Sequence, residues 1–179
     1  MSMKRRVRPV SEIELQNVMG VVSRAVQWMH DNGSIQWNET YPAISDFQLD
    51  VEHGALWGIY EEEMLCGVCA VDQQAYPEYG VVQWENTHMP VFYLHRVAVD
   101  PQKHGRGLAG DLICHAIRYA RQQGGYALRT DTNEKNIPMR RTFEKLGFAQ
   151  MEPTFLLEHN LAMGPCVAYE KTWVKEEEA

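Results

Sequence analysis

Lys103, His104 and Arg106 stand together with Gly105 and Gly107 in a segment whose residue types suit the binding of phosphate. The basic side chains attract an anion, and the two glycines let the backbone approach it closely. An apolar, β-branched run precedes the segment and an apolar pattern of helical spacing follows it, which predicts a loop between a strand and a helix. Since the first N–H groups of a helix favour phosphate, we expect a phosphate-binding site here.

Two nucleotide-binding patterns can be tested on this loop. A Walker loop requires Lys-Ser or Lys-Thr after its last glycine, whereas Leu108 and Ala109 follow Gly107. A dinucleotide fold requires Gly-x-Gly-x-x-Gly, which residues 105–110 satisfy, and an acid about 20 residues further on, near which Asp131 lies. A dinucleotide-dependent enzyme therefore stays open as an alternative.

The loop resembles the signature of the GCN5-related N-acetyltransferases (GNATs), which reads Arg/Gln-x-x-Gly-x-Gly/Ala after a strand ending in Ala-Val. His104, Gly107 and Ala109 fall at the matching distance from Val99, and only His104 departs from the family's residue types. Gln102 also starts a match to the bare pattern, but it lies two residues too early relative to the strand.

A second block downstream resembles the same family in order and spacing. It consists of a strand at residues 128–131, Asn136, and the run Phe143-Glu-Lys-Leu-Gly-Phe, which is similar to the family's Tyr-Glu-Lys-x-Gly-Phe. The resemblance covers roughly residues 55–148. It implies an α/β fold with a mixed, mostly antiparallel sheet of about six or seven strands flanked by helices, splayed between strands four and five.

Hydrophobic periodicity and turn residues predict elements that suit such a fold. Ser11, with Glu14 three residues on, is the expected cap of the first helix. The predicted strands are residues 5–9, 55–61, 64–73, 91–99, 126–131, 148–157 and 166–174. The predicted helices are residues 11–31, 42–51, 108–123 and 136–147.

Length, composition and charge indicate one globular domain over residues 1–179, with an acidic tail at residues 175–179. No apolar run follows the basic start of the chain or is long enough to span a bilayer, so we expect a cytoplasmic protein without membrane contact. The net charge of −7 disfavours nucleic acid as a partner and favours a cationic one. A monomer or a homodimer fits these properties.

The four cysteines do not form a metal-ligand pattern. Cys66 and Cys69 lie in a predicted strand, where an odd separation directs side chains to opposite faces. Cys114 and Cys166 stand alone. We expect four reduced cysteines and no metal.

The resemblance implies acetyl-CoA as co-substrate. The backbone of residues 104–110 is expected to hold the pyrophosphate, and that of residues 97–99 to bind the pantetheine arm and polarise the thioester carbonyl. Asn136 either contacts the pantetheine or only caps a helix. The expected CoA-contacting residues are Val97, Ala98, Val99, His104, Gly105, Arg106, Gly107, Leu108, Ala109, Gly110 and Asn136.

The accepting amine must lose a proton, because an alkylamine with a pKa near 10.4 is only about one part in a thousand neutral at pH 7. Strand alternation predicts that Tyr93, His95, Val97 and Val99 share one face, so His95 is the candidate general base, as in the arylalkylamine branch that it resembles. The alternative is a buried structural histidine. Glu85 and Glu63 are rival bases.

The family's tyrosine acid, which protonates the departing thiolate, is replaced by Phe143. Water, Tyr126 or Tyr169 are the candidate substitutes. The replacement also keeps a noncatalytic acyl-CoA sensor open as an alternative function.

Aromatic residues near the two predicted N-terminal helices, together with Tyr93, are candidates for holding the acceptor, or they belong to the core. They are Trp28, Trp37 and Tyr41. The resemblance implies an N-acetyltransferase that uses direct attack in a ternary complex, with a small-molecule primary amine as the expected acceptor and a protein or peptide amine as the alternative.

Overall fold

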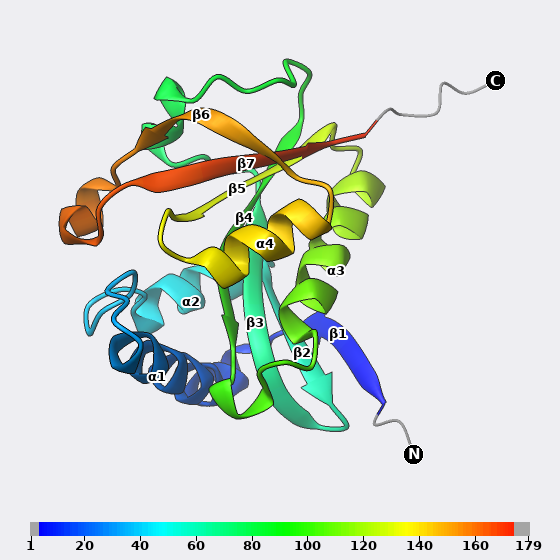
Figure 1. Ribbon diagram of the computed structural model, residues 1–179. Coiled ribbons are helices and arrows are strands. Elements are labelled where there is room, and N and C mark those ends of the chain that lie inside the picture. The colour runs from blue at the N-terminus through cyan, green and yellow to red at the C-terminus, as the bar shows by residue number, and fades with distance from the viewer. Residues whose placement is uncertain (1–3, 174–179) are drawn as a thin grey trace. The chain divides into compact units, whose positions relative to one another are not determined.

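The computed structural model describes residues 4–173 (Figure 1). These residues form two compact units. The first comprises Met1–Val71 and His95–His115, and the second comprises Asp72–Leu94 and Ala116–Ala179, within the described range. Strand β4 (Val91–Val99) and helix α3 (Leu108–Gln122) each contribute one part to either unit. The predicted acidic tail at residues 175–179 lies outside the described residues.

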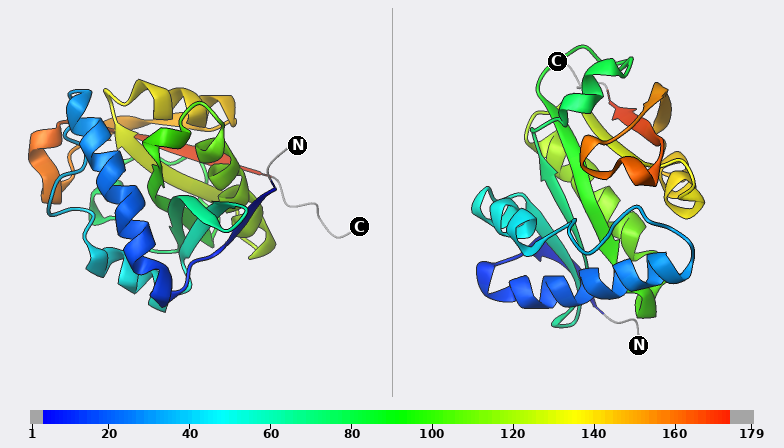
Figure 2. Two further views of the ribbon diagram at one scale, coloured as in Figure 1. Left: turned by 90° about the horizontal axis from the view of Figure 1, so that it is seen from below. Right: turned by 90° about the vertical axis from the view of Figure 1, so that its left-hand side faces the viewer.

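The first unit contains antiparallel strands covered by two helices. Strand β2 pairs in antiparallel fashion with β1 and with β3. Arg5 of β1 lies opposite Glu61 of β2, and Leu56 of β2 lies opposite Ala70 of β3. Helices α1 and α2 pack on one side of β2 and β3 (Figure 2). The element bounds are β1 (Arg5–Pro9), η1 (Glu12–Glu14, a 3-10 turn), α1 (Leu15–Asp31), α2 (Ile44–Glu52), β2 (Leu56–Glu61) and β3 (Met64–Asp72).

The core of this unit follows from the 3.6-residue period of α1, which directs one apolar stripe toward the sheet. Cross-strand neighbours such as Tyr60 and Leu65 present the complementary sheet face. The buried cluster includes Val18, Val22 and Ala25 from α1, Phe47 from α2, and Leu56, Tyr60, Leu65, Val68 and Ala98 from the strands.

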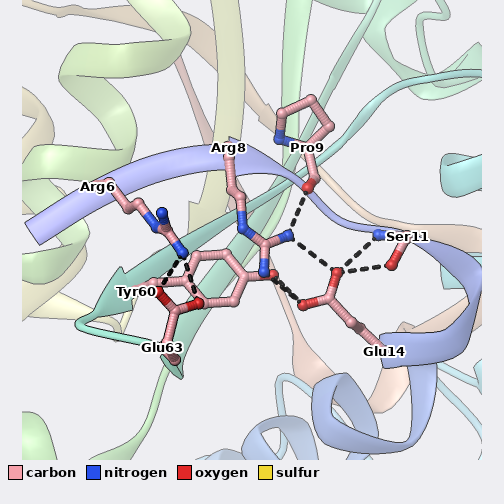
Figure 3. A network of polar contacts seen from close by, with 7 residues as sticks. All are labelled: Arg6, Arg8, Pro9, Ser11, Glu14, Tyr60 and Glu63. Atoms are coloured by element: carbon pink, nitrogen blue, oxygen red, sulfur yellow. Dashed lines mark hydrogen bonds and ion pairs between the residues drawn. The ribbon is translucent and has the colours of Figure 1, made fainter.

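A polar network fixes the entry into the helical layer (Figure 3). The carboxylate of Glu14 accepts hydrogen bonds from the backbone N–H and the hydroxyl of Ser11, at 3.0 and 2.8 Å. It also accepts from Arg8 Nη2 at 2.8 Å and from the Tyr60 hydroxyl at 2.9 Å. Ser11 therefore caps the first turn as predicted, and Glu14 additionally ties that turn to β1 and β2.

The second unit combines parallel and antiparallel pairing. Val91 and Tyr93 of β4 pair with Ala127 and Arg129 in parallel, whereas β5 pairs with β7, and β7 with β6, in antiparallel fashion. A parallel pair needs a crossover connection, which α3 provides. The element bounds are η2 (Pro77–Val81, 3-10), β5 (Ala127–Asn133), α4 (Ile137–Lys145), β6 (Ala149–Phe155), η4 (Glu158–Met163, 3-10) and β7 (Cys166–Thr172).

The strands follow the order β1-β2-β3-β4-β5-β7-β6 in one mixed sheet. This confirms the expected α/β class with a mostly antiparallel, seven-stranded sheet flanked by helices. Differences are confined to boundaries and short turns: α2 begins at Ile44 rather than residue 42, β5 continues to Asn133, and η2 lies between the strands predicted at residues 64–73 and 91–99. Within residues 4–173, none of the helices has the length and apolarity needed to cross a membrane.

Candidate functional site

The predicted phosphate-binding segment is a loop between β4 and α3 in the first unit. A 3-10 turn (η3, Pro101–Lys103) leads to Gly105 and Gly107, whose φ angles are 75° and 78°. These values lie in the left-handed region that glycine adopts without the strain imposed on other residues. Both glycines are therefore required by the backbone path of the loop.

Helix α3 begins directly after the second glycine. The N–H of Asp111 donates to the Gly107 carbonyl at 3.0 Å, closing the first helical turn. Helix geometry leaves the preceding N–H groups without an acceptor one turn earlier, and the helix dipole adds partial positive charge there. This end of α3 has the polarity of an anion-binding site.

Helix α1 holds the first part of the loop. Asp100 accepts from the Gln102 N–H at 3.0 Å and from Arg24 Nη2 at 2.6 Å. Burial raises the pKa of Asp100, but the hydrogen bonds from Arg24 and Gln102 outweigh it, so the pKa is lowered overall. One turn further along α1, Trp28 meets the His104 ring edge to face, with ring centroids 4.8 Å apart. Trp28 thus contacts a predicted phosphate-loop residue.

The second part of the loop is held by Glu61, the last residue of the strand predicted at residues 55–61, to which the sequence assigned no role in the site. In the structure Glu61 pairs with Met64 at the end of β2, and its carboxylate is buried. Lys103 and Arg106 both form ion pairs with it. Its position at the end of an apolar strand was the only signal in the sequence.

Strand β4 contains an irregularity just before the residues expected to contact CoA. Arg96 has a φ of 51°, so the two-residue alternation predicted from Tyr93 to Val99 is interrupted there. The expectation that these residues share one face assumed an unbroken extended strand and is corrected. His95 is buried, as is Ala98, whereas Val97 and Val99 are partly buried.

Four predicted site residues belong to the second unit. Tyr93 is buried, and its hydroxyl lies 3.5 Å from Arg129 Nη1. Glu85 is exposed, and Tyr126 is partly buried with its ring 5.3 Å from that of His88. Asn136 accepts from the Met139 N–H at 3.3 Å, which is the helix-cap role. Their roles with a bound ligand stay predictions.

The segment that carries Glu85 is fastened to the sheet by buried charges. Arg129 Nη2 donates to the Asn86 carbonyl at 2.7 Å, and the Asn86 N–H donates to the Glu170 carboxylate at 3.1 Å. Arg129 and Glu170 also pair with each other at 3.3 Å. This anchoring fixes where the residues around Glu85 lie within the second unit.

Phe143 is a core residue of the second unit. Its ring packs against Phe148 and Tyr169, at centroid distances of 5.4 and 5.3 Å. The Tyr169 hydroxyl accepts from Arg140 Nε at 3.1 Å and donates to Glu144 at 3.2 Å. Burial raises the pKa of Tyr169. Tyr169, one candidate replacement for the missing tyrosine acid, is thus engaged in a hydrogen-bonded network.

The remaining aromatic candidates lie in the first unit. Trp37 is buried in the hydrophobic core, and Tyr41 packs against that core while partly buried. This is the core role that the sequence left open for them.

The four cysteines are free thiols, and burial raises the pKa of Cys69 to about 12. Among residues 4–173, His, Cys, Asp and Glu side chains form no group of three that could hold a metal ion.

Comparison with known proteins yields relatives of one kind. The uncharacterized N-acetyltransferase YesJ of Bacillus subtilis (strain 168) is 27% identical over 103 residues, which are 56% of this chain and 57% of YesJ. The match thus spans little more than half of that relative. The structure of a GNAT-family acetyltransferase from Streptococcus agalactiae 2603 superposes with a TM-score of 0.82, at 27% identity over 96% of each chain.

A more distant structure shares the fold. It is the PaiA N-acetyltransferase of Thermoplasma acidophilum in complex with coenzyme A, with a TM-score of 0.72, 14% identity, and coverage of 96% of this chain and 100% of that one. Residues 22–148, which include β4, the glycine loop and α3, match the acetyltransferase (GNAT) family. The chain therefore belongs to the acetyltransferase (GNAT) family.

Proposed function

We propose that this protein is an acetyl-CoA-dependent N-acetyltransferase that acts on a primary amine of a small molecule. The observation that carries the proposal is the loop between β4 and α3, in which two left-handed glycines lead into the start of a helix beside Lys103 and Arg106. This arrangement suits the diphosphate of coenzyme A. The related fold of the Thermoplasma acidophilum enzyme, solved with coenzyme A, supports the choice of cofactor.

In the proposed reaction the amine nitrogen attacks the thioester carbonyl carbon while both substrates are bound. A C–N bond forms, the C–S bond breaks, and the CoA thiolate leaves. The ammonium form of the amine loses one proton before attack, and we assign its removal to His95, directly or through a water molecule. The nitrogen loses a second proton as the amide forms, and this proton passes through water to the departing thiolate or to solvent. The backbone of residues 97–99 is proposed to bind the pantetheine arm and polarise the carbonyl.

The thiolate leaves without the tyrosine that the family pattern supplies, because Phe143 has no hydroxyl and is buried against two aromatic rings. A thiol with a pKa of about 8.5 is a competent leaving group, so a water molecule or Tyr126 is a sufficient proton donor. The same observation favours a second candidate function, an acyl-CoA-binding sensor without turnover.

Calorimetric titration with acetyl-CoA, followed by a thiol-release assay over a panel of small amines and peptides, tests the proposal. Binding with turnover of a small amine supports it. Turnover of peptides alone would mean that the acceptor is a protein or peptide amine instead of a small molecule. Binding without turnover over the whole panel favours the sensor. Absence of acetyl-CoA binding would refute both functions.

A further inference from the structure

Glu61 is the meeting point of three basic side chains in the first unit. Its Oε1 lies 2.7 Å from Arg106 Nη2 and 3.3 Å from Arg5 Nε, and its Oε2 lies 3.4 Å from Lys103 Nζ. Lys103 and Arg106 belong to the glycine loop, on either side of His104 and Gly105. One carboxylate from β2 thus holds both permanently charged side chains of the loop.

The Glu61 side chain is far less exposed to solvent than the side chains of its partners in the loop. The Glu61 side chain is 2% exposed, whereas those of Lys103 and Arg106 are 23% and 31% exposed. The acid therefore lies beneath the two loop cations, which remain accessible to a ligand. Burial raises the pKa of Glu61, but Arg106, Lys103 and Arg5 outweigh it, so the pKa is lowered and the carboxylate is charged at neutral pH.

The charges of this cluster do not balance. Arg5 has a second acidic partner, Asp111 in the first turn of α3, at 3.0 Å. Even with Asp111 included, the cluster has more basic than acidic side chains. Ion pairs that served only to join β1, β2 and α3 would need no excess of positive charge. The excess positive charge lies on Lys103 and Arg106, the partly exposed side chains of the loop.

We propose that Glu61 is a positioning residue for binding of the diphosphate of acetyl-CoA. It holds Lys103 and Arg106 in place at the start of α3, so that the loop is ordered before the ligand arrives. Preorganisation of this kind raises affinity because less side-chain and loop freedom is lost on binding. Glu61 acts through the cations and makes no contact with the diphosphate, whose charge it would repel. The inference rests on the proposed function.

The test compares two ligands by calorimetry: coenzyme A, and pantetheine, which lacks the diphosphate together with the 3′-phosphoadenosine attached to it. We expect Glu61→Gln to weaken binding of coenzyme A on the order of tenfold, the scale of a small misplacement of binding groups. Pantetheine binding should not change. Glu63→Gln is the matched control, because Glu63 follows Glu61 by two residues in the β2–β3 turn, is 80% exposed and pairs with Arg6, so its effect should stay within about twofold.

A double-mutant cycle identifies the route of the effect. If Glu61 acts through the loop cation, Glu61→Gln should cost much less affinity for coenzyme A in an Arg106→Gln background than in the wild type. If Glu61→Gln does not fold, Glu61→Asp keeps the charge and withdraws it by one methylene, and the same selective loss is expected.

Three results would overturn the inference: unchanged affinity for coenzyme A, tighter binding, which would mean that Glu61 merely competes for the cations, or equal losses for both ligands. Wild-type protein that binds neither ligand would instead refute the proposed function, so the two failures are distinguishable.

Discussion

Arg96 donates from Nε to the carboxylate of Asp50 at 2.8 Å while its own backbone is in the left-handed region, with a φ of 51°. A non-glycine residue in that region costs on the order of 1 to 3 kcal/mol and persists only when its surroundings determine it. The ion pair between Arg96 of β4 and Asp50 of α2 holds Arg96 in this conformation. Arg96 directly precedes residues 97–99, whose backbone we assign to pantetheine binding.

Replacing Asp50 with Asn should therefore destabilise the protein strongly. The side chains of Arg96 and Asp50 are 11% and 7% exposed, so the change leaves a nearly buried guanidinium without its charged partner. The free energy of unfolding should fall by about 3 kcal/mol. Urea denaturation measures it. Glu52→Gln, at an exposed position of the same helix, should change it by less than about 0.5 kcal/mol.

Replacing Gly107 with Val should remove the loop conformation. A β-branched residue at a φ of 78° costs roughly 1 to 2 kcal/mol, and the loop can avoid that cost by changing its path. We expect affinity for coenzyme A to fall at least about tenfold while the fold is kept, as measured by calorimetry and circular dichroism. Gly80→Ala, at an open position without positive φ, is the control and should leave affinity unchanged. A Gly107→Val protein with wild-type affinity would contradict the loop assignment.

Stability at acid pH should depend on Glu14. The hydrogen bonds from Arg8 hold the pKa of Glu14 far below its ordinary value, against a smaller opposing effect of burial (Figure 3). A carboxyl group with a depressed folded-state pKa adds stability above its unfolded-state pKa of about 4.3, and this stability is lost as the pH falls toward the folded-state value.

Urea unfolding of Glu14→Gln between pH 3 and pH 7 checks this dependence. The variant should be less stable than the wild type at pH 7, and the difference should shrink as the pH falls below about 4.3. Glu12→Gln, an exposed neighbour in η1, should follow the wild-type curve. A constant difference across the range would exclude the ionised form of Glu14 as the source.

Replacing His95 with Ala should separate turnover from binding. If His95 accepts the amine proton, kcat should fall by about 10² to 10⁴ with unchanged affinity for acetyl-CoA. The fall should be smaller at high pH, where more of the amine is neutral without a base. His53→Ala, at the exposed end of α2, is the matched control. A parallel loss of acetyl-CoA affinity would indicate that His95 is a structural strand residue.

The sequence predicted the elements well where local signals coincide. The bounds of β1 and β4 were predicted correctly, in β4 because its apolar run ends at Asp100-Pro101 and in β1 because the cap residue Ser11 follows closely. Asn136 caps α4, which is one of the two roles that the sequence left open for it. The glycine loop was located for the same reason. Its residue types, its spacing and the following helical pattern all occur within one short stretch of the chain.

The contacts that hold the loop could not be predicted in this way. Glu61 was predicted as the end of a strand, but its burial and its basic partners arise only when β1 and β3 pair with β2. The left-handed Arg96 has no local signal, because its conformation depends on Asp50 from another element. The contact of Trp28 with His104 likewise arises from the packing of α1.

The ion pairs of Arg5 have a kinetic consequence for the loop. Arg5 and its partner Asp111 are 106 positions apart in the chain, and Glu61 is 56 positions from Arg5. Contacts between residues so far apart in the sequence form late in folding, because the entropy of the long intervening chain must be lost before they can form. β1 pairs at the end of the strand order, so its fraying should open the loop as well. Amide hydrogen exchange in β1 and at the hydrogen-bonded N–H groups of Lys103 and His104 should accordingly report a common free energy of opening.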